Sequence, residues 1–292
     1  MVPPLDDSRS FLQGVVGDGR PPLAALALGL LAAGGAALFL AATGHFLPHD
    51  EQFLGMTARE LCARHGCRIV HFMVHDRAAF GGVLAAVSLL YLWLVQFPLR
   101  EGAAWAWWTI LLSGAVGFAS FLAYVGYGYL DAWHAVGTLV LLPCFVLGLA
   151  RSRSILSRPR GAGSLLSPSV RPPWLSAHGI GRACLLLASL GAAGAGVVIL
   201  GVGMTTVFVP QDLEYMGVPV EELHALNPRL VPLIAHDRAG FGGALLSSGM
   251  TATLCVWCGR PSRALWQVLA LAGIAGFGPA IGVHFAIGYT DA

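Results

Sequence analysis

The sequence predicts an all-α, polytopic helical membrane protein built from two parallel repeats of a four-helix unit, with seven spans present. Three observations predict this class: the composition, a series of long uncharged runs and an internal repeat. Of the 292 residues, 56% are hydrophobic and only 11% are charged, and the mean hydropathy is +0.71. A soluble domain carries roughly 25% charged residues. The composition therefore excludes a soluble enzyme, a disordered chain and a nucleic-acid-binding protein.

Seven runs of the sequence contain no Asp, Glu or Arg, and the chain has no Lys. The runs cover residues 21–49, 78–99, 102–130, 132–150, 183–211, 239–259 and 264–290, so that the shortest has 19 residues. Since roughly 20 apolar residues cross the hydrocarbon core of a bilayer, each run predicts one transmembrane helix.

The distribution of arginine predicts the orientation of these helices. Alternating spans place eleven arginines on the side that holds the N-terminus and six on the other side. Basic residues are enriched on the cytoplasmic side of membrane proteins. We therefore expect a multi-pass protein of the bacterial plasma membrane with a cytoplasmic N-terminus, and the opposite side is called the outer side.

The internal repeat has a period of about 161 residues, because His75–Gly82 recurs as His236–Gly243 with seven of eight residues identical. Further blocks match in the same order: 46–50 with 208–212, 60–61 with 222–223, 114–118 with 273–277, and 128–132 with 288–292. We expect a first four-helix unit at residues 1–150, a cytoplasmic Arg/Ser/Pro-rich linker at 151–179 and a second unit at 180–292. The second unit is predicted to be incomplete, because an eighth helix would follow Ala292.

Ionisable residues gather at the outer ends of the predicted helices. Charged groups inside a membrane bundle are candidates for function, because burying them away from water is costly. The candidate polar site consists of the two His-Asp-Arg triplets and the residues that open the fourth helix: His75, Asp76, Arg77, Asp131, His134, His236, Asp237, Arg238 and Asp291. The alternative is interfacial anchoring, in which Asp76 complements a helix N-terminus and Arg77 extends to the lipid headgroups.

Part of this site has the spacing of a metal or haem site. His71 and His75 are four residues apart, and Asp131 and His134 are three apart, so each pair shares a helical face. These four residues could bind a divalent cation, or His75 and His134 could supply the two axial ligands of a haem. Pro232 replaces His71 in the second unit, which predicts a single site.

The six cysteines divide by location. Cys62 and Cys67 lie in the first outer loop, where an oxidising compartment would allow a disulfide. Cys255 and Cys258 form a C-x-x-C sequence at the cytoplasmic end of a span, and we expect two packed thiols there rather than a redox pair.

The run from His75 to Gly82, together with Gly128–His134, resembles a family of bacterial multi-span membrane proteins. Some members of that family are joined to a dihydroorotate-dehydrogenase-like flavin domain. The resemblance implies a fused or partner enzyme domain. No catalytic residue of such a domain is present in this chain.

Several functions remain open from the sequence, including whether the protein is an enzyme at all. The first is a redox or metal/cofactor protein that uses the outer His/Asp/Arg site. The second is a non-catalytic module that anchors a partner or a fused enzyme domain. A transporter is a third, although His284 is nearly the only ionisable group predicted at mid-membrane. A lipid-modifying enzyme with an Asp base and a His acid is a fourth, but no nucleophile is apparent.

Overall fold

The computed structural model describes residues 16–120, 129, 132–158, 160–173 and 175–289. Every regular element among these residues is helical, as predicted. The long helices are α2 (Arg20–Thr43), α5 (Arg68–Gln96), α6 (Ala104–Ser120), α8 (Ala132–Ser152), α9 (Ala177–Gly203), α12 (Leu230–Cys258) and α13 (Arg263–Ile287). The short elements are α3 (Pro48–Leu54), α4 (Ala58–His65), η1 (Arg153–Ile155), η2 (Ala162–Leu166), α10 (Pro210–Met216) and α11 (Val220–Leu226).

Six of these helices, namely α2, α5, α8, α9, α12 and α13, are long and apolar enough to cross a membrane. A multi-pass membrane protein is therefore the class that the structure supports. The predicted third span, 102–130, corresponds to α6, which has 17 residues in the described part of the chain and is shorter than the other six. The count of seven spans thus stays a prediction, because residues 121–128 and 130–131 lie outside the described residues.

The two central helices begin well before the uncharged runs that predict them. Helix α5 begins at Arg68 rather than at residue 78, and α12 begins at Leu230 rather than at residue 239. The His-Asp-Arg triplets consequently lie inside these helices and not at their first turns. Counting uncharged residues misses this extension, because the charges of the triplets are paired with other buried charges in the folded bundle.

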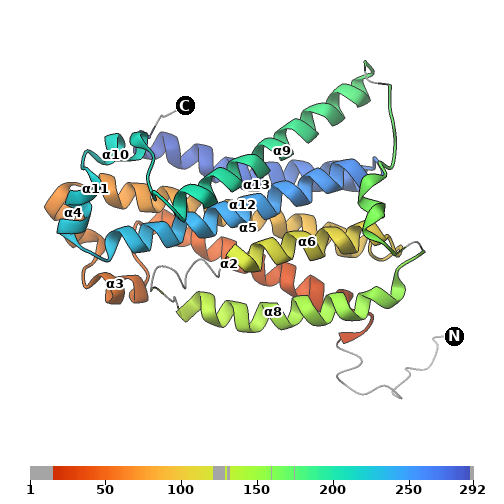
Figure 1. The fold of residues 1–292 in the computed structure, drawn as a ribbon, viewed down its shortest axis with the longest axis horizontal. Coiled ribbons are helices and arrows are strands. Elements are labelled where there is room, and N and C mark those ends of the chain that lie inside the picture. Colours follow the sequence, from red (N-terminus) through yellow and green to blue (C-terminus); the bar gives the residue numbers. More distant parts are fainter. Residues whose placement is uncertain (1–15, 121–128, 130–131, 159, 174, 290–292) are drawn as a thin grey trace.

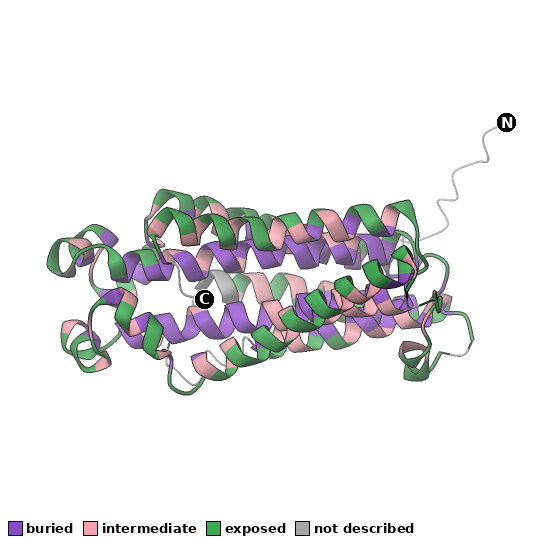
Figure 2. Cartoon of the chain, turned by 90° about the horizontal axis from the view of Figure 1, so that it is seen from above, coloured by how far each residue is buried: buried purple, intermediate pink, exposed green. Residues whose placement is uncertain are grey.

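The long helices form one elongated bundle, and the short helices α3, α4, α10 and α11 gather at one end of it (Figure 1). That end is called the short-helix end below. Helices α5 and α12 form the buried centre, whereas the outward faces of the surrounding helices are exposed (Figure 2). In a membrane protein such exposed apolar faces are the surfaces that contact lipid.

The two halves of the chain are intertwined. Helix α2 packs along α5, and α9 packs along α12. The third long helix of each half then packs against the other half: α13 lies mainly against α5, and α6 lies mainly against α12. The short-helix end is joined in the same crossed manner, because Arg68 Nη1 donates to the Tyr215 carbonyl at 3.3 Å and Arg229 Nη1 donates to the Phe53 carbonyl at 2.7 Å.

The short helices are held by their own capping groups. The Asp50 carboxylate accepts from the backbone N–H of Leu47, and the Asp212 carboxylate accepts from that of Val209, so both aspartates satisfy a helix N-terminus. Thr57 and Glu60 form a reciprocal capping box at α4, as the sequence spacing predicts. The hydrogen bond that the Thr57 backbone N–H donates to the Glu60 carboxylate lowers the pKa of Glu60.

Cys62 and Cys67 are joined by a disulfide that ties α4 to the start of α5, with their Cα atoms 4.3 Å apart. The other four cysteines are free, including the buried Cys255 and Cys258. We expect the denatured, unreduced protein to react with iodoacetamide at four cysteines, and the reduced protein at all six. Mass spectrometry counts the adducts. Six adducts without reduction would contradict the disulfide.

Candidate polar and ligand-binding site

The two repeated triplets lie side by side on α5 and α12, near the short-helix end of the bundle. Asp76 and His236 are each 2% exposed, His75 is 8% exposed and Arg238 is 9% exposed. Asp76 lies more than two turns inside α5, and Arg77 faces buried carboxylates rather than the helix surface. The contacts therefore disfavour interfacial anchoring, which needs a free helix N-terminus and an outward-pointing arginine.

Arg77 joins the two halves of the chain through two carboxylates. Its Nη2 donates to Asp50 Oδ2 at 2.5 Å, and Asp50 belongs to α3 in the same half. Its Nε donates to Asp237 Oδ2 at 3.2 Å, and Asp237 belongs to α12 in the other half.

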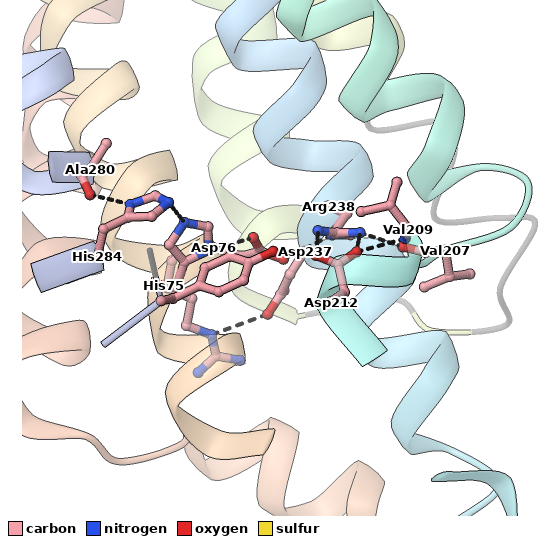
Figure 3. A network of polar contacts seen from close by, with 11 residues as sticks. His75, Asp76, Val207, Val209, Asp212, Asp237, Arg238, Ala280 and His284 are labelled. Carbon is pink, nitrogen blue, oxygen red and sulfur yellow. Dashed lines mark hydrogen bonds and ion pairs between the residues drawn. The ribbon is translucent and has the colours of Figure 1, made fainter. Parts of the chain in front are cut away.

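Arg238 makes the corresponding contacts from α12. Its Nη1 and Nη2 donate to the two carboxylate oxygens of Asp212 at 2.5 and 3.0 Å, in the forked geometry that guanidinium groups favour. Its Nη1 also donates to the Val207 carbonyl, and its Nε lies 3.4 Å from Asp76 Oδ2 on α5 (Figure 3). Each arginine thus binds one aspartate of its own half and one aspartate of the other half.

Histidine and tyrosine side chains also contact the carboxylates of the four aspartates. Within each triplet the histidine lies against the next residue: His75 Nδ1 is 3.1 Å from Asp76 Oδ1, and His236 Nδ1 is 2.9 Å from Asp237 Oδ1. Tyrosine hydroxyls bind the other two carboxylates, from Tyr129 to Asp50 Oδ1 at 2.5 Å and from Tyr289 to Asp212 Oδ1 at 2.8 Å.

The cluster carries more carboxylates than guanidinium groups. Its acidic members are Asp50, Asp76, Asp212 and Asp237, and the basic members paired with them are Arg77 and Arg238. If all six were ionised, the group would carry two net negative charges in a site removed from water. Moving an unpaired charge from water into a protein interior costs roughly several kcal/mol of free energy. A cluster with excess negative charge therefore favours bound protons, cations or hydrogen-bond donors, and it disfavours anions.

A cavity of about 600 Å³ opens onto this cluster between α2, α5, α8 and α12. Its walls are almost entirely apolar and include Ala37, Leu40, Phe80 and Leu141. The ionisable residues that line it belong to the cluster: Asp50, Asp76, Arg77, His236 and Asp237. A second cavity, of about 220 Å³ between α5, α9, α12 and α13, has no ionisable residue in its lining among the described residues.

One carboxylate oxygen of Asp76 at the cavity has no hydrogen-bond donor among the described residues. It is 2% exposed and lines the cavity, yet its Oδ2 accepts no hydrogen bond from any residue that the structure describes. The Nε of Arg238, at 3.4 Å, neutralises its charge without the geometry of a hydrogen bond. A buried acceptor without a donor costs about 1–3 kcal/mol, so a donor on a bound molecule would be favoured there.

The predicted metal or haem ligands are not brought together within the described residues. Asp131 and Asp291 lie outside those residues, and of His134 only the backbone is described. His71 is exposed on α5, whereas His75 is buried. In the described part of the chain no three His, Cys, Asp or Glu residues are arranged to hold a metal ion. A metal or haem bound by His71, His75, Asp131 and His134 therefore stays a prediction.

Comparison of this chain with protein-family models, with curated proteins and with solved structures gives no match.

Sequence reasoning missed five members of the cluster, namely Asp50, Tyr129, Asp212, Tyr289 and His284. The first four sit inside repeated blocks, as Asp50 recurs in Asp212 and Tyr129 in Tyr289. Their repetition was a usable signal, because polar residues kept in both copies are candidates for a shared contact. His284 had no such signal, since the position that aligns with it is Tyr124.

Proposed function

We propose that this multi-pass membrane protein binds a neutral, quinone-type molecule in the 600 Å³ cavity, with the polar ring against the His/Asp/Arg cluster. The observation that carries the proposal is the cavity itself, an apolar chamber whose ionisable lining residues, among those that the structure describes, all belong to the cluster. Pockets of about 300–1,000 Å³ with apolar walls and a few convergent polar groups are typical of small-molecule sites.

The polar end of the cavity can serve both redox forms of such a ligand. A quinone carbonyl only accepts hydrogen bonds, and Arg77 is a donor at the cavity wall. A quinol hydroxyl also donates, and Asp76 Oδ2 is an acceptor at the same wall. A site that offers both a hydrogen-bond donor and an acceptor can bind the quinone as well as the quinol.

The charge of the cluster argues against an anionic ligand such as a lipid phosphate. Four carboxylates and two guanidinium groups leave the cavity end negative or neutral, according to how many protons it holds. A phosphate would add further negative charge in a medium of low dielectric constant, where like charges repel strongly. A neutral headgroup avoids this repulsion.

The wider setting belongs to the same proposal. Two repeats at residues 1–150 and 180–292, with seven spans and a cytoplasmic N-terminus, would put the cluster near the outer face of a bacterial plasma membrane. The repeated sequence blocks and the arginine asymmetry support this arrangement. A fused or partner flavin domain, implied by the family resemblance, would then supply or accept the electrons, and the chain would act as its membrane module.

A thermal-shift titration with decylbenzoquinone tests the proposal on the protein in detergent. Saturable binding adds RT ln(1 + [L]/Kd) to the free energy of unfolding, which is about 2.7 kcal/mol at a hundredfold excess over Kd. We expect saturable stabilisation of the native chain and its loss in Ala37→Phe, because Ala37 lines the cavity.

Ala32→Phe is the matched control. Ala32 lies on the same helix, is exposed and does not line the cavity, so this variant should keep the stabilisation. Equal stabilisation of the Ala37→Phe variant, or no saturable shift in the native protein, would overturn the proposal.

A further inference from the structure

A second histidine meets the first triplet from a neighbouring helix. His284 on α13 reaches His75 on α5, with the two Nε2 atoms 3.2 Å apart (Figure 3). The imidazole rings are perpendicular, with centroids 4.3 Å apart. The opposite nitrogens of both rings are also engaged, because His75 Nδ1 lies 3.1 Å from Asp76 Oδ1 and His284 Nδ1 lies 2.6 Å from the Ala280 carbonyl oxygen.

These contacts fix the number of protons in the group. A carbonyl oxygen only accepts, so His284 Nδ1 must carry a hydrogen. An ionised Asp76 also only accepts, so His75 Nδ1 must carry a hydrogen as well. The contact between the two Nε2 atoms then needs one more hydrogen, since two bare nitrogens would face each other with lone pairs. With three hydrogens on the four ring nitrogens, one of the two rings is a positively charged imidazolium.

The total number of protons on Asp76, His75 and His284 is the same if Asp76 carries one of them. If Asp76 is protonated and donates to His75 Nδ1, then His75 Nε2 carries the ring hydrogen and donates to His284. Asp76, His75 and His284 hold three protons in that arrangement too, and the group is neutral. With both imidazoles neutral and Asp76 ionised, the group would hold one proton fewer.

We infer that His75 and His284 form a proton-binding site that holds one shared proton between α5 and α13. This site compensates one of the two excess carboxylates of the cluster through Asp76, and its inner end adjoins the cavity that Asp76 lines. The hydrogen bond between the two Nε2 atoms exists only while this proton is bound. The inference rests on the contacts of α5 and α13, and it stands whether or not a quinone binds.

The surroundings of the pair are suited to a positive charge. The ionisable groups that face it are Asp76 on α5, Arg238 on α12 behind Asp76, Tyr289 after α13, and Asp212 of α10 behind Tyr289. The ring of Tyr289 stacks on His284 at 10° with centroids 5.5 Å apart and lies edge-on to His75 at 5.4 Å. Arg238 donates to both carboxylate oxygens of Asp212, which compensates its positive charge.

Nitrogen-15 NMR of histidine-labelled protein in lipid nanodiscs tests the site directly at neutral pH, without added ligand. We expect a scalar coupling between the two Nε2 atoms across the hydrogen bond. The ring nitrogens of His75 and His284 should carry three protons together if Asp76 is ionised, and two if Asp76 holds the third proton. His284→Gln keeps a hydrogen-bonding side chain but cannot share the proton, so it should remove the coupling and leave His75 with a single ring proton.

His178→Gln is the control, since His178 is exposed at the start of α9, and it should leave both signals unchanged. Two neutral imidazoles in the native protein, with two ring protons and no coupling, would overturn the inference. The native spectrum alone decides the question if the His284→Gln variant fails to fold. Because no ligand is added, a failed quinone titration leaves this result unaffected.

Discussion

Replacing Arg238 with methionine is expected to lower the free energy of unfolding by about 3–5 kcal/mol, the range for removing one partner of a buried ion pair. The guanidinium donates to both oxygens of Asp212 and to the Val207 carbonyl, and it lies beside Asp76. Methionine fills much of the same volume but leaves Asp212 and Asp76 without their cation. Most of the loss is therefore the cost of unpaired buried carboxylates and not of lost packing.

Urea unfolding in mixed detergent micelles measures this change. Arg59→Met is the control, because Arg59 is exposed on α4, and it should change the free energy by less than about 0.5 kcal/mol. The double variant Asp212→Asn/Arg238→Met should be more stable than Arg238→Met alone, since one unpaired charge has been removed. A single variant as stable as the Arg59→Met control would show that the ion pair is not buried in the membrane protein.

The substitution Gly196→Ala should cost about 1–3 kcal/mol, the range for overfilling a packed interior. Gly196 on α9 faces α12 so closely that a Cβ atom there would lie 2.7 Å from the Leu246 Cα and 2.8 Å from the Gly242 carbonyl oxygen. Both neighbours are backbone atoms and cannot rotate away. Glycine at helix contacts in membranes allows this approach of two backbones.

Gly194→Ala is a control on the same helix, two residues away, because a Cβ atom at Gly194 meets nothing within 4 Å. Alanine is about 1 kcal/mol better than glycine in a helix interior, so this variant should be neutral or more stable. Thermal unfolding in detergent compares the two variants. The close contact of α9 and α12 would be refuted if both alanine variants unfolded at the same temperature as the native protein.

The sequence predicted the class of this fold well and its helix ends less well. Composition and uncharged runs depend on solvation alone, and they identify helices such as α2 and α9 because these helices are apolar and exposed along most of their length. The starts of α5 and α12 depend on pairing between charges far apart in the chain. A count of charges along the sequence cannot detect that two opposite charges will neutralise each other.

The candidate site, too, could be predicted from the sequence only in part. The repeat identified His75, Asp76, Arg77 and their second copies as residues of interest. The structure places both triplets near each other and buries His75, Asp76, His236 and Arg238. A repeat shows which residues correspond, but it does not show which residues touch. That Arg77 binds Asp237 rather than its own neighbour Asp76 follows from the packing of α5 against α12, which no local pattern encodes.

The crossed pairing of arginines and aspartates makes the two identical triplets depend on each other. An Arg77 that changed would leave Asp237 of the other copy without its cation, and an Arg238 that changed would do the same to Asp76. A substitution in either triplet therefore affects both halves of the chain. The two halves are coupled at these positions, because separating them would leave charged groups unpaired in the interior of the bundle.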